Sequence, residues 1–145
     1  MNIGFISTRL TGVDGVSLET AKLVQAFGRM GHKSFYCAGA LEENPSVPSR
    51  LVPRMAFQDP VIMDLYHEAF RTAYPGPKTF TRIHKQADML REELQEFVED
   101  FDIDVLVSQN SSTIPLNLPL GVAIRDLVER TRIPTICHHH DFHWE

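Results

Sequence analysis

Hydrophobic positions in this chain follow two patterns, short apolar runs and helical stripes. Ile3, Phe5 and Ile6 form a run of β-forming apolar residues, which is typical of one buried strand. A polar, glycine-containing turn follows from 8 to 15, and Gly31 suits the C-cap of a helix that comes after it. The predicted buried face of that helix, spaced by three and four residues, consists of Val16, Thr20, Leu23, Phe27 and Met30.

The same two patterns continue through the rest of the chain. They predict strands at 33–37, 51–55, 103–107 and 133–137, and helices at 60–74, 79–101 and 116–130. Pro53 favours an edge position for its strand, because proline donates no ladder hydrogen bond. Strands that alternate with helices imply crossover connections, so we predict an α/β fold: a single Rossmann-like domain over 1–145. Its parallel sheet has the expected order 3-2-1-4-5, with helices on both faces.

Composition narrows the possible functions. The chain has 145 residues, 43% hydrophobic and 23% charged, as in ordinary globular proteins. Its net charge of −5 argues against a nucleic-acid partner bound by bulk electrostatics. Because no apolar run has the length of a transmembrane helix and no signal peptide is visible, we expect a cytoplasmic protein. In that compartment Cys37 and Cys137 are expected to be buried free thiols.

Polar residues follow the predicted strands where a ligand would bind. In open parallel sheets, ligands lie beyond the carboxyl ends of the strands, at the point where the strand order reverses. The residues that the first, fourth and fifth strands bring to this edge are Arg9, Gly12, Asp14, Gly15, Gln109, Asn110, Ser111, His138, His139, His140 and Asp141.

The glycine turn at 11–15 is not a dinucleotide-binding fingerprint. The third glycine of that motif is absent, and no acidic residue ends the second strand, so NAD is not an expected cofactor. Two interpretations of Gly15 have equal weight: its N–H approaches a phosphate at the helix N-terminus, or it only permits a positive φ while Asp14 caps the helix. The sequence also lacks a P-loop and a nucleophile elbow.

The histidine cluster at 138–143 is the most unusual stretch of the chain. Because side chains alternate along a strand, His138 and His140 are expected on one side and His139 on the other. A zinc site with Cys137 is an alternative, but ligands so close in sequence rarely form a closed site, and we expect no bound metal. A catalytic or sugar-binding histidine is favoured instead.

Together these features resemble the N-terminal domain of family 4 retaining glycosyltransferases of the GT-B fold. The resemblance extends over essentially the whole chain. It rests on the opening strand, the turn at 14–16 before a helix that ends in Gly31-His32, the loop at 108–110, and the strand beginning with Ile133-Pro134 that leads to the histidines at 138–140 and Asp141.

The resemblance implies roles for the residues at the sheet edge. It assigns Gly15, with Asp14 and Gly12, to the diphosphate of a nucleotide-sugar donor. It makes His139 the first choice for a catalytic contact with the transferred sugar and His140 the second. The expected acceptor-binding residues are Arg9, Gln109, Asn110 and Ser111. The family uses the nucleotide sugar as a co-substrate and needs no metal for the transfer step.

The 145 residues lack the donor-binding domain of such enzymes. We therefore expect an acceptor-binding part of a glycosyltransferase that is inactive by itself, with an unfinished sheet edge that favours homo-oligomers. An alternative from another class is a non-catalytic module that binds a phosphorylated small molecule or a partner protein at the same edge.

Overall fold

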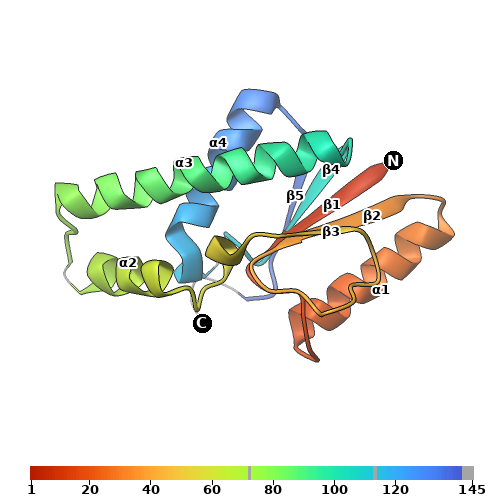
Figure 1. Cartoon of the computed structure of the whole chain (residues 1–145), viewed down its shortest axis with the longest axis horizontal. Coiled ribbons are helices and arrows are strands. Elements are labelled where there is room, and N and C mark those ends of the chain that lie inside the picture. Colours follow the sequence, from red (N-terminus) through yellow and green to blue (C-terminus); the bar gives the residue numbers. More distant parts are fainter. Residues whose placement is uncertain (72, 113, 142–145) are drawn as a thin grey trace.

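The computed structural model describes residues 1–71, 73–112 and 114–141. Its centre is a parallel sheet of five strands in the order β3-β2-β1-β4-β5 (Figure 1). The strands are β1 (Asn2–Ser7), β2 (Lys33–Ala38), β3 (Ser49–Leu51), β4 (Val105–Gln109) and β5 (Thr135–His138). The predicted α/β class and strand order are confirmed.

Helices cover both faces of the sheet, as predicted. They are α1 (Gly15–Arg29), α2 (Pro60–Phe70), α3 (Pro77–Asp100) and α4 (Leu118–Thr131), with short 3-10 turns η1 (Pro53–Met55) and η2 (Pro115–Asn117). In Figure 1, α3 and α4 lie on one side of the sheet and α1 on the other. α2 lies farther from the sheet and packs against α3 and α4.

Several predicted boundaries are wrong by a few residues. The strand expected at 51–55 is shorter and lies earlier, because Pro53 starts the 3-10 turn η1. The helix expected to reach position 74 ends at Phe70. α1 ends at Arg29, so Met30 lies outside the predicted buried face and is 67% exposed. Gln109, expected in a loop, is the last residue of β4.

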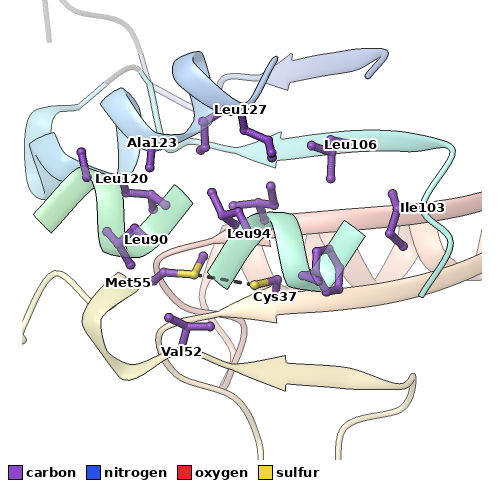
Figure 2. Packing of buried hydrophobic residues seen from close by; sticks show 14 of the residues in the cluster. Cys37, Val52, Met55, Leu90, Leu94, Ile103, Leu106, Leu120, Ala123 and Leu127 are labelled. Carbon is purple, nitrogen blue, oxygen red and sulfur yellow. Dashed lines mark hydrogen bonds between the residues drawn. The ribbon is translucent and has the colours of Figure 1, made fainter. Parts of the chain in front are cut away.

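The larger core lies between the sheet and the pair α3 and α4. Figure 2 shows Leu90 and Leu94 of α3, Leu127 of α4 and Leu106 of β4 as parts of this one cluster. These side chains stabilise the fold mainly by removing apolar surface from water. The clustered residues that are fully buried include Ile6, Cys37, Met55, Leu90, Leu94, Phe97, Leu106, Leu120, Ala123 and Leu127.

The two cysteines have different surroundings. Cys37 is buried and its Sγ lies 3.7 Å from the Sδ of Met55. Burial raises the pKa of its thiol to about 12, so the thiol stays protonated at neutral pH. Cys137 is exposed, so the expectation that both thiols are buried is wrong for Cys137, whereas both are free as expected.

The second core joins the other face of the sheet to α1. Phe5 lies 6.3 Å from Phe27 of α1 and 6.1 Å from Tyr36 of β2, measured between ring centroids. Thr20 is fully buried, and its hydroxyl donates to the Val16 carbonyl at 2.8 Å. These contacts hold α1 against the sheet.

Gly39 fixes the segment that follows the edge strand. A Cβ at this position would lie 1.9 Å from the backbone nitrogen of Ala56. The turn after β2 therefore touches the end of η1 backbone to backbone, and only glycine permits this approach. Close packing therefore explains why the residue that follows β2 at the carboxyl edge of the sheet is glycine.

No helix in the described part of the chain is long and apolar enough to span a membrane.

Candidate functional site

The polar residues predicted at the sheet edge converge on one hollow, here called the sheet-edge hollow. It has a volume of about 210 Å³ and lies where β1 and β4 meet the N-terminus of α1. Its lining comprises Ser7, Thr8, Arg9, Asp14, Val16, Phe57, Gln109, Asn110, Ser111, Ile114, Leu116, Asn117 and Asp141. The structure therefore brings together Arg9, Asp14, Gln109, Asn110 and Ser111 of the predicted site residues.

Asp14 caps α1 as one interpretation of the sequence predicted. Its Oδ1 accepts the N–H of Ser17 at 3.0 Å, and its Oδ2 accepts the Ser17 hydroxyl at 2.9 Å. Partial burial disfavours the ionised carboxyl, but the bonds from Ser17 and the nearby Arg9 outweigh it and hold the pKa of Asp14 below its usual value. A negative charge therefore stands at the N-terminus of the helix at neutral pH.

Gly12 and Gly15 differ in backbone conformation. Gly12 has a φ of +78°, a left-handed conformation that favours glycine. Gly15, the first residue of α1, is not among the glycines with positive φ, so the interpretation that it only permits that conformation is wrong. A Cβ on Gly15 would meet nothing within 4 Å, so packing does not require a glycine at this position.

Arg9 bridges Asp14 and the aromatic ring of Phe57. Its Nη2 lies 3.3 Å from Asp14 Oδ2, and its guanidinium carbon lies 5.8 Å from the centre of the Phe57 ring. Because the Arg9 side chain is 37% exposed, the guanidinium can also reach a ligand anion. It is the cation that the site offers beside the helix N-terminus.

Gln109 and His140 form a hydrogen-bonded pair. Gln109 is 1% exposed, and its Oε1 lies 2.9 Å from His140 Nε2. Because the amide oxygen can only accept, the proton of the neutral imidazole resides on Nε2, which leaves Nδ1 as an acceptor. The Gln109 Nε2 is buried and has no hydrogen-bond partner, so this amide donor remains for a ligand.

His138 and His140 share one side of the chain, as strand alternation predicts. Their ring centroids are 4.4 Å apart. Burial and the neighbouring His138 lower the pKa of His140, although the carboxylates of Asp141, Glu19 and Asp14 oppose the shift. His140 is therefore neutral near pH 7 and suited to accept or donate a hydrogen bond.

His139, the first choice from the resemblance, lies on the exposed surface between these two histidines. Neither His139 nor His140 is among the residues that line the sheet-edge hollow, but His140 contacts the lining residue Gln109 through its Nε2. Its catalytic role stays a prediction.

Asn110 connects the exits of β4 and β5. It adopts a left-handed backbone with φ of +59°. Its Nδ2 donates to Asp141 Oδ2 at 2.6 Å, and its Oδ1 accepts the N–H of His140 at 3.2 Å. The side-chain amide is thus engaged within the protein, as is the Ser111 hydroxyl, which donates to the Gln109 carbonyl at 3.3 Å.

Sequence reasoning missed several of the lining residues. Ser7 ends β1 and donates its hydroxyl to the Arg9 carbonyl at 3.0 Å, which shapes the turn after the strand. Phe57 and Leu116 come from connections outside the predicted ligand loops, and no local pattern marks either of them as a site residue. Asn117 caps α4 through the N–H of Leu120 at 3.0 Å and donates to the carbonyl of Met55 at 3.0 Å.

Among residues 1–71, 73–112 and 114–141, no three histidine, cysteine, aspartate or glutamate side chains cluster so as to hold a metal ion. His143, which belongs to the predicted histidine cluster, lies outside the described residues.

Comparison with known proteins gives two relatives of the same description. The chain is 29% identical to the mannosylglucosylglycerate synthase of Petrotoga mobilis and 28% identical to that of Thermotoga maritima, in both cases over its whole length. It spans 33% of each of these relatives. No protein-family model matches the chain.

Among solved structures, a glycosyltransferase from Rickettsia africae matches with a TM-score of 0.49 and 11% identity. The match covers 94% of this chain and 28% of that protein.

Proposed function

We propose that this chain is part of the acceptor-side N-terminal domain of a retaining GT-B glycosyltransferase, which works with a donor-binding domain outside these 145 residues. The observation that carries the proposal is the similarity, over the whole chain, to two synthases that are about three times as long. By the name of those relatives, the product would be a mannosylglucosylglycerate, and from this we infer a nucleotide-activated mannose as donor and a glucosylglycerate as acceptor. The chain alone is expected to be inactive.

The sheet-edge hollow suits the donor side of such a transfer. In the reaction the acceptor hydroxyl oxygen bonds to the anomeric carbon, the bond from that carbon to the diphosphate breaks, and the acceptor proton leaves with the phosphate. The N–H of Gly15 in the first turn of α1 and the guanidinium of Arg9 would stabilise the negative diphosphate, whereas the Asp14 carboxylate that caps the helix would oppose it.

Of the two candidate histidines, we propose His140 as the contact with the transferred sugar. Gln109 fixes its tautomer, so that Nδ1 accepts a sugar hydroxyl while the free Gln109 amide donates to the same sugar. The neutral state that its lowered pKa favours suits this exchange of hydrogen bonds.

The test uses the full-length gene product with GDP-mannose or UDP-glucose as donor and glucosylglycerate as acceptor. Released nucleotide is measured by a coupled assay, and the anomeric configuration of the product is read by NMR. We expect retention, and we expect His140→Asn to lower kcat by roughly 10²-fold while His139→Asn lowers it less than about threefold.

A folded full-length protein that forms no product with either donor contradicts the proposed function. If His139→Asn has the large effect and His140→Asn the small one, the transferase survives but the histidine assignment is reversed. If product forms with inversion, only the retaining assignment falls.

A further inference from the structure

A second hollow adjoins the first one. It has a volume of about 220 Å³ and is lined by Phe57, Gln58, Met63, Tyr66, His67 and Leu116. Phe57 and Leu116 line both hollows, so the second one continues the sheet-edge hollow toward α2. We call this second hollow the α2 ledge.

The apolar residues of the α2 ledge are not required by the core. The buried face of α2 consists of Ile62, Leu65 and Ala69. Met63 lies outside that face and is 45% exposed, and Tyr66 is only partly buried. The ledge therefore presents apolar and aromatic surface to water, a cost that binding sites commonly retain.

The aromatic rings of the ledge are held in place by their neighbours. Tyr66 packs against Phe70 with ring centroids 4.9 Å apart and against His67 at 5.6 Å. Arg9 lies over the ring of Phe57 from the side of the sheet-edge hollow. Both rings therefore have neighbours within the protein when no ligand is bound.

We propose that the α2 ledge binds the pyranose ring of the acceptor, an inference that rests on the proposed function. One face of a pyranose presents C–H bonds, which are attracted to the negative face of an aromatic ring. The hydroxyls at its edge match the polar rim of the ledge, Gln58 and the exposed His67. The attacking hydroxyl then points across Phe57 and Leu116 into the sheet-edge hollow.

The sizes of the two hollows support one sugar unit in each. Both lie below the roughly 300 Å³ at which sites for drug-sized ligands begin. The side-chain amide of Asn110 and the hydroxyl of Ser111, both expected from the resemblance to bind the acceptor, already bond within the protein. The aromatic surface of the ledge, by contrast, is not occupied by hydrogen bonds within the protein.

Binding is tested directly in full-length protein that carries 3-fluorotyrosine. The Tyr66 fluorine signal is assigned by its loss in Tyr66→Phe, and glucosylglycerate or methyl α-D-glucopyranoside is titrated without donor. We expect a saturable shift of the Tyr66 signal and none at Tyr74, which is 89% exposed. A Tyr66 signal that does not respond to either sugar overturns the proposal.

Kinetics provide the second test. Tyr66→Ala is expected to raise the acceptor KM roughly five- to tenfold, with kcat and donor hydrolysis in the absence of acceptor within about twofold of the parent. Tyr66→Phe keeps the ring and should restore the parent KM. Phe80→Ala removes an aromatic residue on α3 that is 51% exposed and serves as the matched control.

The two proposals fail in different ways. A protein that transfers sugar normally, with an unchanged acceptor KM in Tyr66→Ala, contradicts the ledge and leaves the transferase intact. A protein without transfer that still shows the Tyr66 shift contradicts the transferase, and the ledge then stands as a sugar-binding site.

Discussion

Asp14 places a carboxylate where the proposed donor diphosphate would bind. The same side chain caps α1 through Ser17, so its structural and electrostatic roles can be separated by substitution. Asparagine keeps the capping oxygen and removes the charge, whereas alanine removes both.

We expect Asp14→Asn to lower the donor KM of the full-length enzyme by a few-fold, because it removes a like charge from the diphosphate site. Asp14→Ala should destabilise the fold by about 1 kcal/mol through loss of the cap. Steady-state kinetics and urea unfolding measure the two effects. A higher donor KM in Asp14→Asn would show that the Arg9–Asp14 pair helps binding rather than opposing it.

His140 makes the stability of the folded chain depend on pH. Its pKa is lowered from 6.5 in the folded state, because of burial and His138. Its contribution to stability is therefore present above pH 6.5 and is lost as the pH falls through the folded-state pKa.

His140→Asn should reduce the loss of thermal stability between about pH 7.5 and about pH 5.5, because the unfolded chain then gains no proton at this position. Melting temperatures of parent and variant at both pH values measure this difference. His32→Asn, which removes another histidine far from the hollow, is the control, and an identical pH dependence in parent and His140→Asn would contradict the prediction.

For the individual site residues, the sequence predicted which side chains lie at the same edge of the sheet. It did not predict which of them form hydrogen bonds with each other. Strand ends and alternation suffice to place Gln109 and His140 at one edge. Their hydrogen bond joins residues 31 positions apart and depends on the register of β4 against β5, which no local pattern contains. Tertiary contacts likewise brought Phe57 into the hollow.

Two glycines differ in whether the surrounding structure has room for a side chain. Gly4 lies in β1, where a Cβ would be 2.8 Å from Phe97 Cε1 and 3.1 Å from Ile103 Cγ2. Gly28 lies near the end of α1, where a Cβ would meet nothing within 4 Å.

Gly28→Ala should stabilise the protein by about 0.5 kcal/mol, because alanine loses less backbone entropy in a helix. Gly4→Ala should destabilise it by roughly 2 kcal/mol or more, since the sheet or α3 must shift to make room. Chemical unfolding of the two variants tests both signs. Equal effects would mean that α3 can move away from β1 at little cost.

The elements themselves were largely predictable because their apolar periods are clear. The stripe of α3, for example, has Ala87, Leu90, Leu94 and Phe97 buried as expected. Boundaries were less predictable, because capping and proline geometry decide them. Asp59 caps α2 through the N–H groups of Val61 and Ile62, a contact that the apolar pattern does not report.

At the scale of the whole molecule, β5 is an edge of the described sheet. Ile136 pairs in register with Val107, which is 4% exposed, yet Ile136 itself is 55% exposed. An exposed apolar edge strand can pair with another chain.

We therefore expect the 145-residue chain alone to self-associate, as the sequence suggested, and Ile136→Lys to reduce that association by placing a charge on the edge. Sedimentation velocity over a concentration series measures the effect. Met30→Lys, at an apolar residue that is 67% exposed on another part of the surface, is the control. A monomeric parent at all concentrations contradicts the prediction.

Asn110 has a consequence for sequence variation. Its amide joins Asp141 and the backbone of His140, and its backbone needs a residue that tolerates a left-handed conformation. A glycine at 110 would satisfy the backbone but leave the Asp141 carboxylate without this donor. In related chains the two positions should therefore co-vary, with aspartate at 141 retained where 110 is asparagine and replaced where it is glycine.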